Sequence, residues 1–295
     1  MNPSYKLAFG RSVQMCMWGP GGSRKNYSAV TGNYVAGVVA AENFFRAPIN
    51  VLRVGFKNAK FFDFGALRPP DSWQVVGNRG SVRMKRIADV AFAPIDPENP
   101  QPVVMAMMSA DCPAVFALEH DEFGREIGCW FAHAGLECLV PKEPANRYSV
   151  IETIWSARQS KGFRGHIAFY LSGGIGSCCY GLENVDDVRV RLSLRYGPKY
   201  EEILKTATKG PRRSSPSVDL KEVYMREVAR AFFEISSVTF IADGHCTACL
   251  GQPGNRTLWS NVYDGGSKKV PLNPRNFLCW AWTPPPPTPR RAWLS

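Results

Sequence analysis

Hydrophobic and polar positions divide the middle of the chain into short apolar runs separated by polar turns. Three apolar runs follow one another at Val103–Met108, Ala114–Leu118 and Ile127–Ala132, and two more lie at His166–Leu171 and Val238–Ala242. Runs of this length that are apolar on both faces are typical of strands in a sheet that is covered on both sides. The pattern therefore predicts five buried strands.

Two other segments have the spacing of amphipathic helices. Tyr148–Gln159 places Ile151, Ile154 and Trp155 on one face. A second helix is expected to begin at Asp219, with Glu222 three residues later, which resembles a capping box. Its apolar stripe consists of Leu220, Val223, Val228, Ala231, Phe232 and Ile235.

The order strand, helix, strand, helix, strand predicts the α/β class, with a mixed β-sheet covered by helices. At 295 residues and 45% hydrophobic composition the chain is long enough to bury a substantial core. We expect one domain over residues 1–282. The remaining residues, 283–295, form a proline-rich C-terminal tail that we expect to lie outside the core.

Composition also limits the cellular setting and the partners. No run approaches the roughly 18 apolar residues of a membrane helix, and the N-terminal segment lacks the apolar core of a signal peptide. Nine cysteines, an odd number, do not suggest a secreted disulfide framework. These features predict a cytoplasmic protein with no membrane partner.

The formal net charge of +11 favours anionic partners. The basic residues are dispersed, however, with short local clusters at Arg83–Arg86, Arg212–Arg213 and Arg290–Arg291, and no nucleic-acid-binding motif accompanies them. Charge alone carries no sequence specificity. We therefore expect a solvated basic surface and no nucleic-acid partner.

The strongest candidate for chemistry is the pair Cys112 and His133, each placed where an apolar run ends. Thiolate and imidazole together suit a zinc or copper ion. Alternatively, His133 can take the proton of Cys112 and create a nucleophile. A buried cysteine and an unrelated histidine are a third interpretation of the same spacing, because single residues of these types are usually structural.

Two further motifs follow predicted strands. The glycine-rich segment Leu171–Tyr180 can direct backbone N–H groups at an anion, or it can be a tight turn. His245-Cys246-Thr247-Ala248-Cys249 contains a single CxxC, which is half a zinc site, a redox pair, or two buried thiols at a strand end.

Taken in order, these segments resemble the laccase-domain family, also called YfiH-type or multicopper polyphenol oxidoreductase-like proteins. The resembling segments are Gly21–Ser23, Glu42–Arg46, Gln74–Gly77, Ala88–Asp89, Ser109–Pro113, Ala132–Gly135, Gly173–Tyr180, Asp219–Leu220, Cys246–Thr247 and Asn273–Asn276. They span most of the chain. The resemblance implies a fold like that of the YfiH proteins and the cytotoxic necrotizing factors.

The resemblance also implies a purine-nucleoside enzyme. The family carries out phosphorolysis of adenosine- and inosine-type nucleosides and adenosine deamination at a site with zinc, or copper in the older description. Carried over by position, Cys112 and His133 are metal ligands and catalytic residues, and Val76 occupies the position of the first ligand, normally histidine. Nucleoside and phosphate are the implied partners. Contacts to them are expected from Gly174, Gly176 and Arg46.

Several positions depart from the family pattern. Valine cannot bind a metal ion or transfer a proton, so Val76 leaves two of the three usual ligands. Glu137 stands where an arginine is expected, and Ser260–Tyr263 replaces a basic segment. Two alternative functions follow: a hydrolase or deamidase with a Cys112–His133 dyad, like the cytotoxic necrotizing factors, and a non-catalytic nucleoside-binding protein.

Overall fold

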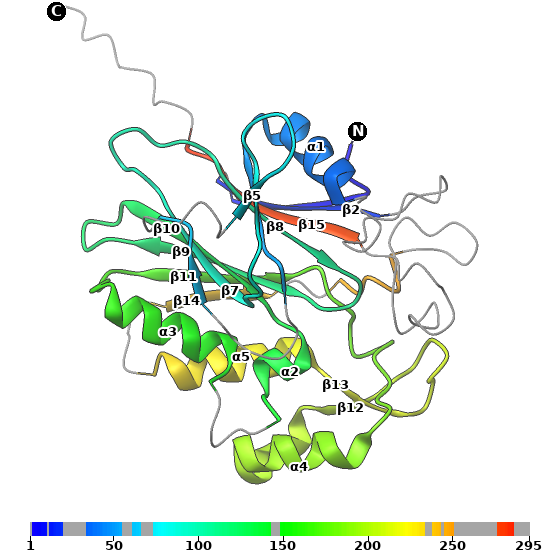
Figure 1. The fold of residues 1–295 in the computed structure, drawn as a ribbon. Coiled ribbons are helices and arrows are strands. Elements are labelled where there is room, and N and C mark those ends of the chain that lie inside the picture. Colours follow the sequence, from blue (N-terminus) through cyan, green and yellow to red (C-terminus); the bar gives the residue numbers. More distant parts are fainter. Residues whose placement is uncertain are drawn as a thin grey trace, which may run out of the picture.

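The computed structural model describes residues 2–10, 12–19, 34–54, 61–65, 73–142, 148–233, 238–242, 245–250 and 276–285. Two large mixed sheets account for most of the strands (Figure 1). The first sheet has the order β1 (Tyr5–Phe9), β2 (Val13–Trp18), β15 (Asn276–Trp282), β8 (Val103–Ser109), β3 (Ile49–Val51), β6 (Val82–Met84), β5 (Trp73–Val75). The second has the order β14 (Val238–Ala242), β11 (Ile167–Ser172), β9 (Ala114–His120), β10 (Glu126–His133), β7 (Val90–Pro94), β4 (Phe61–Asp63).

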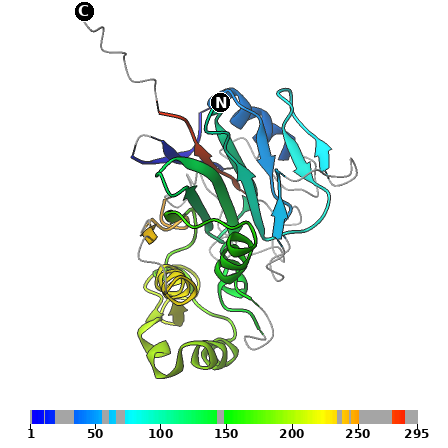
Figure 2. The same ribbon diagram turned by 90° about the vertical axis from the view of Figure 1, so that its left-hand side faces the viewer.

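Helices cover the outer face of each sheet. They are α1 (Tyr34–Phe45), α2 (Leu136–Leu139), α3 (Val150–Ser160), α4 (Val185–Tyr196), the 3-10 helix η2 (Gly197–Glu202) and α5 (Leu220–Ala231). A small hairpin is formed by β12 (Leu204–Thr206) and β13 (Pro216–Val218). Figures 1 and 2 show α1 on the first sheet, and α3 and α5 on the far side of the second.

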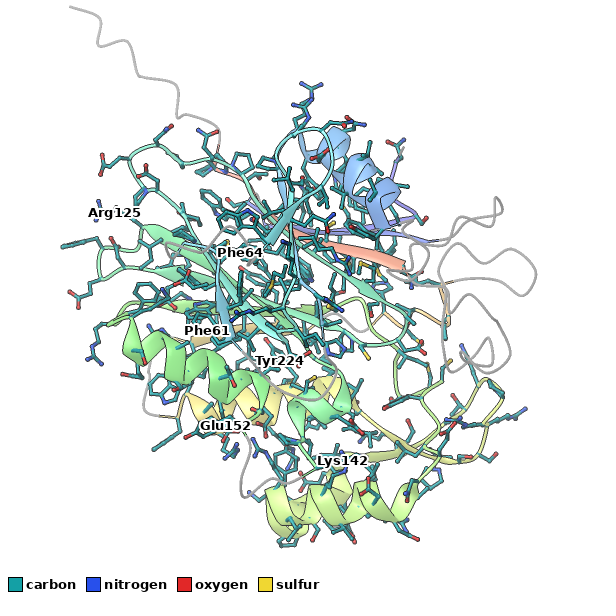
Figure 3. The ribbon with its side chains drawn as sticks, viewed as in Figure 1. Phe61, Phe64, Arg125, Lys142, Glu152 and Tyr224 are labelled. Carbon is teal, nitrogen blue, oxygen red and sulfur yellow. The ribbon has the colours of Figure 1, made fainter. Side chains whose placement is uncertain are left out.

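Three hydrophobic clusters lie between these layers. One fills the space between the two sheets and contains Trp280 of β15 and Phe116 of β9, whose rings are stacked with centroids 5.5 Å apart. A second lies between α1 and the first sheet. The third lies between the second sheet and the helices α2, α3, α4 and α5, and it includes Tyr224 (Figure 3). Residues of each sheet alternate between two clusters, as the period of a strand requires.

A buried ion pair ties the helical layer to the second sheet. Arg158 of α3 donates to the carboxylate of Glu119 on β9 at 2.9 Å, and both side chains are almost fully buried. The indole of Trp130 donates to the same carboxylate. Because each charge is desolvated, loss of one partner is expected to cost about 3–5 kcal/mol.

The five predicted strands are confirmed as β8, β9, β10, β11 and β14, and the two predicted helices as α3 and α5. Asp219 caps α5 by accepting from the backbone N–H of Lys221 and Glu222. A complete capping box is present instead at α3, between Ser149 and Glu152. The α/β class and the single domain are also confirmed.

The division into two sheets differs from the single mixed sheet that we expected. The chain crosses from the first sheet to the second between Ser109 and Ala114, so that the consecutive strands β8 and β9 belong to different sheets. Apolar periodicity is the same for one covered sheet and for two packed sheets, and it therefore does not distinguish them.

Strand β15 was not expected, although it lies in the middle of the first sheet between β2 and β8. It ends at Trp282, next to the predicted boundary at 282, and most of the proline-rich tail (286–295) lies outside the described residues. No helix among the described residues is long and apolar enough to cross a membrane.

Candidate functional site

Strand register brings Cys112 and Asp89 to either side of His133. In the antiparallel pair of β9 and β10, His133 lies opposite Ala114, two residues beyond Cys112. On the other edge of β10, the backbone N–H of His133 donates to the carbonyl of Asp89, the residue before β7. The two neighbouring strands therefore place one thiol and one carboxylate beside the imidazole at the end of β10.

The Nδ1 side of the imidazole faces two buried groups. His133 Nδ1 lies 3.2 Å from Cys138 Sγ and 3.6 Å from Asp89 Oδ1. Cys138 reaches this position because α2, a single helical turn, begins directly after Gly135. All three side chains are at most 1% exposed, so this side of the ring is closed to a substrate.

The opposite side of the imidazole faces Cys112. A Cβ atom added to Gly135 would lie 3.0 Å from Cys112 Sγ and 3.3 Å from His133 Nε2, which places the thiol and this nitrogen around the same point. Cys112 is partly exposed, whereas His133 is buried. A Cβ atom at position 135 would crowd both groups, so the glycine lets them approach the same point.

The surroundings of His133 favour its protonated form. Burial opposes the charged imidazolium, but the neighbouring sulfurs of Cys138 and Cys112 and the carboxylate of Asp89 outweigh it, and the pKa of His133 is raised well above its usual value. Burial raises the pKa of the Cys138 thiol, although His133 opposes this. The arrangement therefore favours a positive charge on His133 between Asp89 and the two sulfurs.

Two sets of donor atoms in this region can be compared with metal sites. Asp89, His133 and Cys138 offer ligand atoms that all lie within 4.8 Å of one another, which is compatible with a metal ion. A catalytic zinc site, however, needs an open position, and this set is closed to solvent. On the Nε2 side of the ring, Cys112 and His133 supply two ligands, one fewer than catalytic zinc requires. The residues present therefore do not complete the catalytic metal site that the resemblance implies.

The glycine loop after β11 lies directly beside this pair. Ile175 donates its backbone N–H to the carbonyl of Asp111, and a Cβ atom on Gly174 would lie 2.6 Å from the ring of Pro113. A cavity of about 130 Å³ runs along the loop. Its lining includes Pro113, Gly174, Gly176, Lys221 and His245.

Tyr180 closes the glycine loop and belongs to the electrostatic surroundings of Cys112. Burial, and then the charges of Cys112 and Asp111, raise the pKa of its phenol. Asp89, Cys138 and Tyr180 are thus site residues that the sequence reasoning did not assign. Asp89 and Tyr180 belong to segments that resemble motifs of the laccase-domain family, and that resemblance could have identified them as site residues. Nothing in the sequence distinguished Cys138 from the other cysteines.

Val76 lies in the turn between β5 and β6 and is 7% exposed. It shares the cluster under α1 with Met108, the residue before the end of β8. The Glu42 carboxylate of α1 holds this turn by accepting from the N–H groups of Asn78 and Arg79. Whether Val76 borders the Cys112–His133 pair stays a prediction. Arg46 is exposed at the end of α1, and its contact with a ligand also stays a prediction.

The other histidines do not replace the missing ligand. His120 and His166 lie together, with ring centroids 5.3 Å apart, at the end of β9 opposite to the Ala114 end that pairs with His133. His245 contacts Tyr5 and lines the small cavity. Glu137 forms an ion pair with Lys142. The motifs at Gly21–Ser23, Ser260–Tyr263 and Asn273–Arg275 lie outside the described residues.

Comparisons with known proteins support the fold. No family model matches the chain, and no curated protein does. Among solved structures, it is similar to the hypothetical protein YfiH of Bacillus licheniformis, with 12% identity and a TM-score of 0.62 over 92% of this chain and 93% of that one. It is also similar to YlmD from Geobacillus stearothermophilus, with 15% identity and a TM-score of 0.64 over 94% and 93%.

A third similar structure is the Neisseria meningitidis protein NMB0706, of the family model DUF152, with 14% identity and a TM-score of 0.56 over 97% of this chain and 99% of that one. All three likenesses extend over nearly the whole length of both chains. The fold predicted from the motif resemblance is therefore confirmed: this chain has the fold of the YfiH-type proteins.

Proposed function

We propose that the chain is an enzyme that acts on purine nucleosides and that Cys112 and His133 are its reacting groups. One observation carries the proposal: Cys112 Sγ and His133 Nε2 converge at Gly135, while Asp89 lies beside the other imidazole nitrogen. The motif resemblance to the laccase-domain family suggests nucleosides as the substrate class, and the similarity in fold to YfiH and YlmD is consistent with that resemblance.

The raised pKa of His133 suits it to act as a general acid in phosphorolysis. A phosphate oxygen attacks C1′ of the ribose, and the bond between C1′ and N9 breaks. The electron pair of that bond goes to the purine, which takes a proton at N7 from the His133 imidazolium. The products are ribose 1-phosphate and the free base. In this scheme Cys112, which lies on the Nε2 side of the ring, favours the protonated imidazole.

The cavity along the glycine loop is the proposed position of phosphate. Gly174 and Gly176 line it, next to Pro113, and Lys221 and His245 supply its basic groups. The Asp219 carboxylate already accepts from the backbone N–H groups of Lys221 and Glu222 at the start of α5. We therefore assign the attraction for phosphate to the basic side chains and not to the N-terminus of that helix. No step is assigned to a metal ion, because Cys112 and His133 alone do not complete a catalytic zinc site.

A second candidate is a hydrolase or deamidase, and the position of Asp89 favours it. Carboxylate, imidazole and thiol stand in the order of a nucleophilic triad, in which Asp89 orients His133 and His133 activates Cys112. The Cys112 thiolate would attack a carbonyl carbon. The His133 imidazolium would then protonate the departing amine or ammonia.

The first test is incubation of the purified protein with adenosine or inosine, with and without phosphate, followed by chromatography. We expect free base to appear only with phosphate, and we expect Cys112→Ala to abolish its formation, because the variant removes the sulfur that supports the protonated His133. Cys129→Ala is the matched control, because Cys129 is a buried thiol of β10, the strand that ends at His133, and it packs between the sheets away from the pair.

The other outcomes separate the alternatives. Inosine formed from adenosine without phosphate would indicate deamination. Stoichiometric alkylation of Cys112 by dilute iodoacetamide, without turnover of nucleosides, would favour the hydrolase. Nucleoside binding without either result would favour a non-catalytic protein. Unchanged turnover in Cys112→Ala would refute both enzymatic proposals.

A further inference from the structure

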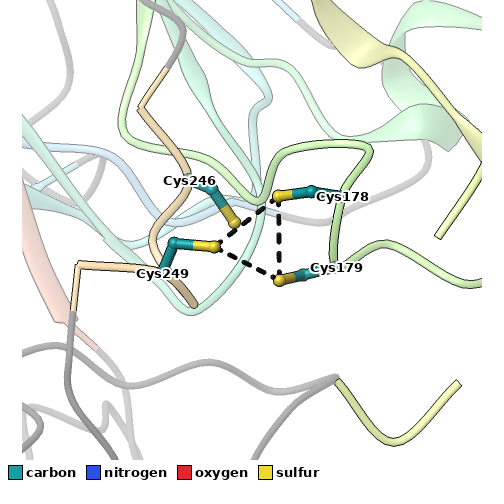
Figure 4. A group of neighbouring side chains, drawn as sticks. All are labelled: Cys178, Cys179, Cys246 and Cys249. Atoms are coloured by element: carbon teal, nitrogen blue, oxygen red, sulfur yellow. Dashed lines mark hydrogen bonds between the residues drawn. The ribbon is translucent and has the colours of Figure 1, made fainter. Parts of the chain in front are cut away.

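A second group of cysteines lies outside the candidate active site, where two loops leave the second sheet. Cys178 and Cys179 belong to the loop after β11, and Cys246 and Cys249 to the segment after β14 (Figure 4). Strands β11 and β14 are parallel, with Leu171 opposite Ala242, so both segments leave the sheet at the same edge. Residues about 70 positions apart in sequence therefore meet.

The four sulfur atoms have the spacing of a single tetrahedral metal site. Cys178 Sγ lies 3.8 Å from Cys179 Sγ and 3.6 Å from Cys249 Sγ, and the last two lie 3.5 Å apart. All four sulfurs lie within 4.8 Å of one another. Four thiolates bound to zinc at about 2.3 Å stand about 3.8 Å apart at tetrahedral angles. All four cysteines are free, and a disulfide would bring two sulfurs to about 2.05 Å.

The backbone around the four sulfurs is held by hydrogen bonds within and between the two loops. Cys249 and Leu250 both donate their N–H groups to the carbonyl of Cys246, and Cys179 donates to Gly176. Thr247 donates to the carbonyl of Gly174 and links the loops directly. The sulfurs are thus presented by two tight turns, which limits the reorganisation needed to bind an ion.

A basic side chain accompanies the cluster. Lys209 Nζ lies 3.9 Å from Cys249 Sγ, and the backbone N–H of Lys209 donates to the carbonyl of Cys178. Four thiolates around a divalent ion carry a net charge of −2. The ammonium group of Lys209 therefore offsets part of the charge that metal binding would create.

We propose that Cys178, Cys179, Cys246 and Cys249 bind one zinc ion that fastens the glycine loop to the segment after β14. A set of four sulfurs selects soft or borderline ions over magnesium and calcium. A polynuclear iron–sulfur cluster binds its cysteines through separate iron atoms and so holds them further apart than these distances. Four protein ligands leave no open position, which makes this zinc site structural.

The zinc site has a consequence for the candidate active site. Gly174 and Gly176 lie between the two groups, because Gly174 packs on Pro113 and Gly176 packs on Cys246. A zinc ion at the four cysteines would fix this loop and with it one wall of the cavity that Pro113 and Gly174 line.

The test is the zinc content of the full chain, measured by elemental mass spectrometry after purification in the presence of zinc. We expect Cys249→Ser to lose about one equivalent of zinc per chain relative to the wild type. Cys112→Ala and the matched control Cys129→Ala should lose none of it. Cys249 is exposed, so its replacement is compatible with folding, which circular dichroism checks.

A second measurement does not depend on any variant. Cobalt added to the reduced, metal-free wild-type protein should give the intense visible bands of a tetrahedral tetrathiolate complex, and zinc should abolish them. An unchanged zinc content in Cys249→Ser, or cobalt bands without thiolate character, would overturn the proposal. Loss of the same equivalent in Cys112→Ala with retention in Cys249→Ser would overturn it as well.

Discussion

The two cysteine-containing groups on either side of the glycine loop differ in what accompanies the sulfur. In the first, Cys112 and Cys138 flank an imidazole that also has a carboxylate beside it. In the second, four thiols face one another, and the ammonium group of Lys209 lies 3.9 Å from Cys249 Sγ. The first group can move a proton, whereas the second offers only metal ligands.

This difference shows that cysteine count alone does not predict chemistry. A thiol beside His133 has a partner that can accept or donate a proton, which is the requirement for acid–base or nucleophilic catalysis. Thiols whose neighbours are other thiols and an ammonium group lack a proton acceptor of the imidazole kind, and their closely spaced sulfurs suit a closed metal site. The neighbours, which are set by strand register and loop position, decide the role.

Removal of zinc should give the largest difference between variants of the two cysteine groups, measured as a change in Tm. If free zinc is present at about 1000 times its dissociation constant, binding stabilises the fold by about 4 kcal/mol. Chelation should then lower the Tm of the wild type by about 8 °C. The Tm of Cys249→Ser should not respond to the chelator, whereas Cys112→Ala should respond like the wild type. Calorimetry measures this, and equal responses of the two variants would contradict the assignment.

Asp89→Asn tests the proton chemistry of the first group. We expect activity to fall by about 10- to 100-fold, since Asn keeps the shape but loses the charge that orients and stabilises the imidazolium. Because Asp89 contributes to the raised pKa of His133, its removal lowers that pKa. The inflection that His133 gives the pH–rate profile should therefore move to lower pH. An unmoved inflection would show that Asp89 has only a structural role.

Val76→His would make the Cys112–His133 site more like the four-cysteine site, because it adds a third metal ligand to Cys112 and His133. If Val76 borders Cys112 and His133, the new imidazole should raise zinc affinity there by about tenfold, because three protein ligands are typical of catalytic zinc. Zinc titration in a Cys249→Ser background isolates this site, and Val76→Thr is the control without a nitrogen ligand. A flat affinity would show that Val76 does not face the pair.

Local sequence signals located the strand ends that carry Cys112 and His133, because each follows a continuous apolar run. The same signals did not locate Cys138, which reaches the imidazole only because α2 turns back directly after Gly135. They also did not identify Cys178 and Cys179 as the cysteines that lie next to the CxxC of Cys246 and Cys249. The vicinal pair Cys178 and Cys179 lacks the usual zinc spacing, and only the parallel pairing of β11 and β14 brings it close.

By itself, the sequence determined the α/β class, the five central strands, and helices α3 and α5. Each of these depends on periodicity, capping or neighbours close along the chain, which are local properties. The tertiary structure decided the split into two sheets, the insertion of β15 between β2 and β8, the placement of Asp89 beside His133, and the meeting of the four cysteines. These features depend on contacts between residues far apart in sequence, and local patterns of apolar and polar residues do not specify such contacts.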